Sequence, residues 1–362
     1  MKLTIPFLPD PEYAQFLSGH TSSLSSIYFP MPKGPVLDSR VRVIAPGKTS
    51  PSLSGLIKTL APLKDIKKYI LVNTRFSPPS LYTDTRVLTD FLDRVETLHK
   101  AVGIQGLVIS DFYLINGLDH TRHDIIGELE AVAGVNTMID SMEKVSSVLD
   151  ILGATRFKPP GRLLLDRSLN RDPQKLSSIY QRVKSLFPKI NVELLANEGC
   201  IFLCPFKPAH DAHISLSNTG LVKESTWKTN HSLGCHAYFN AHPQKFLKSP
   251  FIRPENMVHY HKKADSLKLC GRTLGSQFLK QCIQAYIDQA YGGNLLDLMD
   301  TANFLSHRFH IDNTRLGPSF YNTLTTCTKD CRPCKICKKL FEKTSYEKPV
   351  TLDPIRTFDG HG

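Results

Sequence analysis

The chain has 362 residues and a formal net charge of +12, with 41 % hydrophobic and 22 % charged residues. This composition excludes disorder over the whole length, and the chain contains no apolar run of about 18 residues that would span a membrane. The first residues contain no long apolar core followed by small residues, so we expect no secretory signal and a cytoplasmic protein. The positive charge is compatible with an anionic small molecule or RNA as a partner, although no long Lys/Arg run marks a nucleic-acid surface.

Eight short apolar runs are typical of strands that are buried on both faces of a parallel sheet. They span residues 3–7, 26–29, 69–73, 106–111, 127–133, 162–166, 192–197 and 267–270. Stretches with helical spacing alternate with them, at residues 11–18, 53–63, 85–101, 138–152, 173–187, 254–264 and 275–291. Eight strands alternating with helices predict an α/β fold, a (β/α)8 TIM-type barrel over residues 1–320. A doubly wound open sheet is the main alternative, but no Gly-x-Gly-x-x-Gly follows the first strand.

Residues 321–362 differ in composition and predict a small Cys-rich C-terminal extension, which cannot build a core of its own. This segment contains the run Cys327-x3-Cys331-x2-Cys334-x2-Cys337, with four sulfurs in eleven residues. The run resembles the start of a bacterial ferredoxin motif and predicts a metal centre. It favours an iron–sulfur site over zinc, because zinc sites more often use two separated Cys-x-x-Cys pairs.

A second group of cysteines begins directly after the seventh predicted strand. The chain has nine cysteines and none before residue 200, which indicates reduced thiols and not a disulfide framework. Cys200 and Cys204 are close enough in sequence to ligate one centre, and Cys235 supplies a third candidate thiolate. Together with a fourth ligand they could hold a [4Fe–4S] cluster, and Cys270 at the end of the last strand is the candidate.

Two other interpretations of this second group stay open. With His210 and His213 as additional ligands, the cysteines could bind zinc. Alternatively, the cysteines could be buried structural residues that bind no metal.

Several of the predicted strands end in polar residues, where a parallel barrel places its reacting groups. We expect Glu198, Asp111 and Glu130 to be candidates for the general acid or base. Arg253 and Arg272 could clamp a carboxylate, since guanidinium pairs with it in a bidentate manner. The remaining candidates for substrate binding are Asn73, Asn197 and His210.

The segment from Glu193 to Phe206, with Asn-Glu-Gly-Cys-x3-Cys-Pro at its centre, resembles one branch of the peptidase U32 (collagenase-like protease) family. Matching stretches include Pro11-Glu-Tyr, Ile252-Arg-Pro-Glu and Leu269-Cys-Gly-Arg, so the resemblance extends from Met1 to about Cys337. It implies a barrel with an oxygen-sensitive iron–sulfur cluster. Characterised relatives act in oxygen-independent hydroxylation of ubiquinone precursors and of RNA, with prephenate as the oxygen donor, and some work as heterodimers of two such barrels. In those relatives the cysteines have a different local context, and the tail run is additional here.

Three functions follow as hypotheses. The first is a cluster-dependent enzyme for oxygen-independent hydroxylation, or a related redox modification, of an organic or RNA substrate. The second is a non-catalytic iron–sulfur or zinc subunit that partners a second U32-type barrel. Peptidase activity is the weakest, because the sequence contains no convincing nucleophile and base set.

Overall fold

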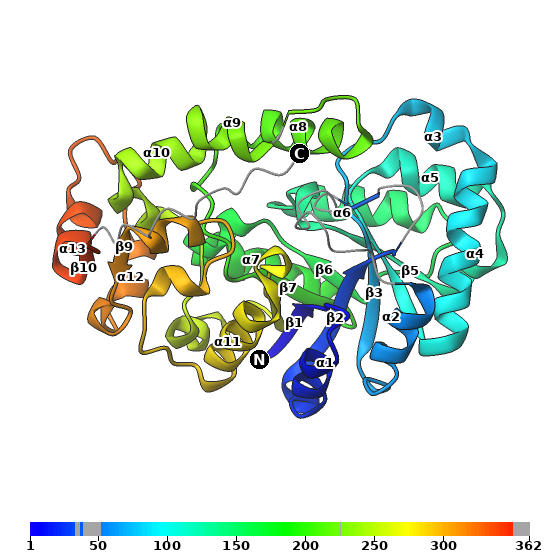
Figure 1. The fold of residues 1–362 in the computed structure, drawn as a ribbon, viewed down its shortest axis with the longest axis horizontal. Coiled ribbons are helices and arrows are strands. Elements are labelled where there is room, and N and C mark those ends of the chain that lie inside the picture. The colour runs from blue at the N-terminus through cyan, green and yellow to red at the C-terminus, as the bar shows by residue number, and fades with distance from the viewer. Residues whose placement is uncertain (33–36, 39–51, 225, 350–362) are drawn as a thin grey trace, which may run out of the picture.

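The computed structural model describes residues 1–32, 37–38, 52–224 and 226–349, and eight parallel strands form a nearly closed barrel within it (Figure 1). The strands are β1 (Lys2–Pro6), β2 (Leu24–Pro30), β3 (Lys67–Val72), β4 (Ile104–Ile109), β5 (Glu130–Ala133), β6 (Arg162–Leu164), β7 (Asn191–Leu195) and β8 (Ser266–Lys268). Their hydrogen-bonded order is β5-β4-β3-β2-β1-β8-β7-β6, in which the sequence order runs once around the cylinder. The predicted TIM-type barrel is therefore confirmed over the doubly wound alternative.

The seam of the barrel lies between β5 and β6, which share no ladder of hydrogen bonds among the described residues. One parallel bridge, between Glu130 and Lys158, crosses it. The buried Glu130 carboxylate accepts hydrogen bonds from the Tyr69 hydroxyl (2.9 Å), the Gln105 amide (2.7 Å) and the Gly161 N–H (3.1 Å). We had expected Glu130 at the carboxyl ends of the strands, as a general acid or base. It is instead the first residue of β5 and lies at the opposite end of the barrel.

Several of the helices that surround the barrel begin directly after a residue whose side chain caps the helix N-terminus. The surrounding helices are α1 (Pro11–Ser18), α2 (Leu53–Leu60), α3 (Pro79–Thr83), α4 (Thr85–Val102), α5 (Phe112–His120), α6 (Met142–Gly153), α7 (Pro173–Leu186) and α11 (Gly275–Asp288). Asp172 caps α7 and accepts from the Lys175 N–H (3.0 Å), as the Asp-Pro pair predicts. The helix predicted at 254–264 is instead a 3-10 turn over Pro254–Tyr260.

A long insertion between β7 and β8 was not anticipated. It contains α8 (Lys207–Thr219), α9 (Thr226–Ser232) and α10 (Cys235–Ala241), which run in a row along one edge of the molecule (Figure 1), and a 3-10 segment over Pro243–Lys248. After α11 the chain adds β9 (Phe309–Ile311), α12 (Phe320–Thr325), α13 (Ile336–Thr344) and β10 (Ser345–Glu347). Because β10 pairs with β9 and α13 packs on the 243–248 segment, the cysteine-bearing tail lies beside the insertion.

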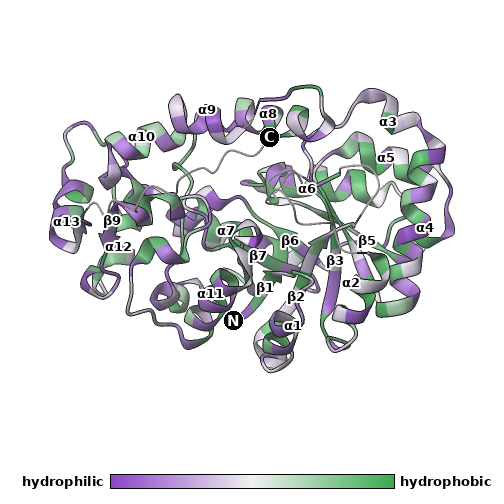
Figure 2. Ribbon diagram, in the orientation of Figure 1, coloured by the Kyte–Doolittle hydropathy of each residue, from purple (hydrophilic) through white to green (hydrophobic). Residues whose placement is uncertain are grey.

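Hydrophobic residues are concentrated on the central strands and on the helix faces turned toward them (Figure 2). A second, smaller apolar cluster lies inside the barrel and consists of Tyr28, Tyr69, Leu71, Val108 and Val132. Two buried cations lie over its aromatic rings at 3.9 Å, Arg162 over Tyr69 and Lys268 over Tyr28. In the described part of the chain, no helix is both long and apolar enough to cross a membrane.

The role of Glu130 at the seam can be tested by Glu130→Gln. We expect the free energy of unfolding to fall by about 1–3 kcal/mol, because a buried acceptor of three hydrogen bonds is weakened. Glu128→Gln is the matched control, since Glu128 is exposed and pairs only with Lys158, so its change should stay below about 0.5 kcal/mol. Denaturant unfolding followed by circular dichroism measures both, and equal stabilities of the two variants would contradict this role.

Candidate metal centre

The loop that follows β7 is fixed by Asn197 and Gly199. The fully buried Asn197 side chain donates to the carbonyls of Cys270 (2.9 Å) and Leu298 (3.1 Å) and accepts from the Cys270 N–H (2.7 Å). A Cβ on Gly199 would lie 2.6 Å from the Cβ of Ala302. Close packing, and not a left-handed backbone, therefore requires glycine here, and the chain is directed so that Cys200 points toward the barrel mouth.

Cys200, Cys204 and Cys235 gather at this mouth. Burial raises the pKa of the Cys200 thiol, and it raises that of Cys235 to about 11. Cys204 lies close enough to both that its thiolate raises the pKa of each further. Two segments, the β7 loop and the start of α10, thus bring three thiols together, as the sequence predicted.

Hydrogen-bond donors lie beside these cysteines. The Lys207 N–H, at the start of α8, donates to the Cys204 carbonyl (3.2 Å), and the backbone N–H groups of Phe206 and Lys207 oppose the rise in the pKa of Cys204 that burial causes. The His236 N–H does the same for Cys235, and the Thr301 side chain, which lines the same pocket as Cys200, opposes the rise in the pKa of Cys200. N–H donors to sulfur are the surroundings in which thiolates hold iron–sulfur clusters.

A small charged pocket opens beside Cys200. Glu198 forms a buried ion pair with Arg167, while Lys207 donates to Asp211 at 2.7 Å. Arg75 lies 3.6 Å from the same Asp211 carboxylate. Asn136, His210, Ile214, Ser215 and Thr301 complete the lining. Three cations face two carboxylates, so the pocket carries a positive surplus that suits an anionic ligand.

The cations of this pocket were only partly foreseen. Arg75 and Arg167 follow predicted strands, but no local pattern distinguishes them from other strand-end residues. Lys207 stands three residues after Cys204, directly after the motif, and that position was the available signal.

The four tail cysteines form a second group, with Cys327, Cys331 and Cys334 between α12 and α13 and Cys337 in the first turn of α13. Burial raises the pKa of Cys337, and the thiolates of Cys327, Cys331 and Cys334 raise it further. The guanidinium of Arg171 acts in the opposite direction on Cys337. The predicted spacing therefore does bring these four side chains into one neighbourhood.

Other predicted site residues are engaged in structural contacts. Asp111 caps α5 through the Tyr113 N–H (3.0 Å) and accepts from the Tyr82 hydroxyl (2.6 Å). Arg253 donates to Asn313 through both Nε (2.8 Å) and Nη2 (2.9 Å), which anchors the 313–317 loop. Arg272 forms an ion pair with Asp38.

Three further candidates lie near the mouth. The Asn73 carbonyl accepts from the pocket residue Asn136 (3.4 Å), and His210 Nε2 accepts from Asn230 (3.1 Å). The Cys270 thiol donates to the Asn197 side-chain oxygen at 3.3 Å.

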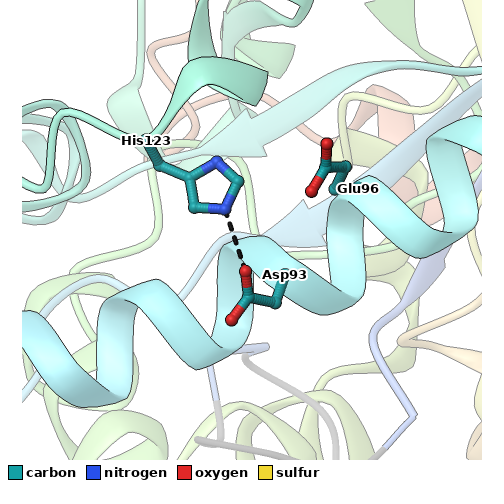
Figure 3. A group of neighbouring side chains, drawn as sticks. All are labelled: Asp93, Glu96 and His123. Atoms are coloured by element: carbon teal, nitrogen blue, oxygen red, sulfur yellow. Dashed lines mark hydrogen bonds and ion pairs between the residues drawn. The ribbon is translucent and has the colours of Figure 1, made fainter.

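One group of ligand atoms lies within 4.8 Å of one another in the described residues, and it is Asp93, Glu96 and His123 (Figure 3). The ring of His123 donates from Nε2 to Asp93 (3.0 Å), while Nδ1 accepts from the Ile125 N–H (3.2 Å) and caps a 3-10 turn. Glu96 pairs with Lys100 at 2.7 Å. Capping and ion pairing thus account for this exposed group.

No family model matches the chain. The chain is 26 % identical over 247 residues to a protein of Methanocaldococcus jannaschii named as an uncharacterised protease, and the match covers 67 % of each chain. The similarity supports a relationship to the peptidase U32 family. It agrees with the resemblance of the Asn-Glu-Gly-Cys segment, whose cysteines now lie at the mouth of a barrel.

The packing argument for Gly199 predicts the effect of Gly199→Ala. The added methyl group should cost about 1–3 kcal/mol of stability, because it meets Ala302 in a packed site. Gly153→Ala in α6 is the matched control, since a Cβ there meets nothing within 4 Å and should be neutral or stabilising. Thermal unfolding measures both, and a restored stability in Gly199→Ala/Ala302→Gly is expected. A single variant as stable as the parent would contradict the close approach.

Proposed function

We propose that this chain is an iron–sulfur barrel protein whose mouth cysteines, Cys200, Cys204 and Cys235, hold a [4Fe–4S] cluster. The supporting observation is the gathering of three partly buried thiols, two of them beside backbone N–H groups that lower their pKa, at the edge of a positively charged pocket. The four tail cysteines would hold a second centre of the same kind. The fourth ligand of the mouth cluster would be Cys270 after a local movement, or a group of the substrate.

The spacing of the sulfurs supports iron over zinc at the mouth. A single zinc ion with bonds of about 2.3 Å to sulfur needs its ligand sulfurs within roughly 4 Å of one another. No three cysteine sulfurs of the described chain lie within 4.8 Å of one another. A four-iron cluster binds each thiolate to a different iron and accepts wider spacing. His210 is a poor zinc ligand here, because its Nε2 already accepts from Asn230.

The proposed reaction is oxygen-independent hydroxylation, or a related redox modification, of an organic or RNA substrate, with prephenate as a candidate oxygen donor. The cluster would supply electron transfer next to the pocket. Arg75 and Lys207 would bind the carboxylate or phosphate of the substrate by displacing part of their pairing with Asp211. Glu198, held by Arg167, would accept a proton at its carboxylate.

A second candidate is a non-catalytic iron–sulfur subunit that partners another barrel protein. Its support is the exposure of two leucines beside the mouth cysteines, Leu203 at 69 % and Leu233 at 78 %. Light scattering on the protein co-purified with a candidate barrel partner would distinguish a heterodimer from a single chain. Peptidase action has no such support, because burial raises the pKa of Cys200 and thus disfavours the nucleophilic thiolate.

The cluster assignment is tested by anaerobic purification of cysteine variants. We expect Cys200→Ala, Cys204→Ala and Cys235→Ala each to lose the visible absorption of the mouth cluster and about half of the bound iron. Cys282→Ala is the matched control, since Cys282 is buried in α11 against Leu298 and should leave iron unchanged. Iron and sulfide contents equal to those of the parent in the three mouth variants would contradict the proposal.

A further inference from the structure

Arg171 is a buried arginine that the proposed chemistry does not yet use. It ends the 3-10 turn over Arg167–Arg171 that follows β6, and it is 4 % exposed. Its Nη1 donates to the carbonyls of Leu247 (3.2 Å) and Ser249 (3.3 Å), and its Nη2 donates to Leu324 (3.1 Å). These contacts join the barrel, the 243–248 segment and α12.

The charge of Arg171 has no carboxylate partner. Among the ion pairs of the described residues, every buried arginine other than Arg171 is within 4 Å of an Asp or Glu oxygen. A buried cation without a counter-charge is costly, typically by several kcal/mol. The acidic groups around its guanidinium are the thiols of Cys327 and Cys337, and Cys327 lies in hydrogen-bonding range. The Nε of Arg171 has no hydrogen-bond partner.

Arg171 also lies beside the mouth loop, the segment of residues 200–206 that carries Cys200 and Cys204. Its guanidinium carbon lies 5.9 Å from the centre of the Phe202 ring, at cation–π range. Phe202 stands between Cys200 and Cys204 in sequence. Arg171 thus lies beside the tail thiols on the one hand and beside a residue of the Cys200–Cys204 loop on the other.

We propose that Arg171 is the counter-cation of an anionic metal–thiolate centre on Cys327, Cys331, Cys334 and Cys337, and that it links this centre to the mouth loop. The inference rests on the proposed function for the presence of metal in the tail. Four thiols lose their protons to solvent when they bind metal, and four thiolates around a dication leave a net charge of about −2. That charge compensates the buried guanidinium. Arg171 is a positioning residue, and loading of the tail centre would hold the Phe202 loop in place.

The test uses full-length Cys200→Ala/Cys204→Ala protein, so that the tail is the remaining metal site. After anaerobic reconstitution with iron and sulfide, iron release to a chelator is timed. Arg171→Gln should release iron at least about ten-fold faster than the parent, and Arg171→Lys, which keeps the charge without the fork, should be intermediate. Arg332→Gln is the matched control, because this substitution removes the same charge from a side chain that is 96 % exposed and follows Cys331 in sequence. The rate of iron release from this variant should differ from that of the parent by less than about two-fold.

The outcomes separate the two claims. A parent that binds no metal overturns the proposed tail centre and this inference with it. A parent that binds iron while Arg171→Gln and Arg171→Lys release it at the parental rate overturns the role of Arg171 alone. If Arg171→Gln does not fold, as circular dichroism would show, the Arg171→Lys rate decides.

The link to the mouth loop has its own readout. Hydrogen exchange of residues 200–206 is compared between the parent chain and Cys331→Ala/Cys334→Ala, which keeps Arg171 and the mouth cysteines. We expect exchange in this segment to be at least about five-fold faster in the variant. Unchanged exchange there, with the tail metal shown to be lost, would overturn the link.

Discussion

The cost of ionising thiols that are withdrawn from water, increased by repulsion between neighbouring thiolates, is the constraint on which the proposed metal centres depend. Cys200, Cys204, Cys235 and Cys337 are buried enough for their thiol pKa values to rise, and neighbouring cysteines raise those of Cys200, Cys235 and Cys337 further. Without a cation these thiols stay protonated, and their proximity contributes little to the stability of the fold. A bound metal reverses the balance, because it stabilises every thiolate at once. Under the proposed function, metal binding would supply this stabilisation at both cysteine groups.

The barrel supplies the rigid frame for both groups. The carboxyl end of β7 directs Cys200 and Cys204 to the mouth, since Asn197 ties the β7 loop to the loop after β8 and Gly199 packs against Ala302. The insertion brings Cys235, and the β9–β10 pair brings the tail alongside. Functional groups on loops above a stable parallel barrel are the usual arrangement of this architecture.

The sequence predicted the barrel well and the site in part. Continuous apolar runs identified all eight barrel strands, because burial on both faces leaves an unmistakable pattern. β9 and β10 were missed because neither lies in a continuous buried apolar run: His310 of β9 is partly exposed, and Tyr346 and Glu347 of β10 are exposed. Cysteine spacing identified both thiol groups. Glu130 was misplaced, because spacing along the chain does not tell whether a carboxylate lies at the start or the end of a short strand. Asp38, which pairs with Arg272, comes from a distant segment that local pattern cannot connect.

The most direct test of the account is iron and acid-labile sulfide analysis, with Mössbauer spectra, of full-length protein purified without air. Two four-iron centres predict about eight iron atoms and eight sulfides per chain, with spectra of valence-delocalised clusters. Protein that contains no iron under these conditions, with the three mouth cysteines and the four tail cysteines open to alkylation, would contradict the account.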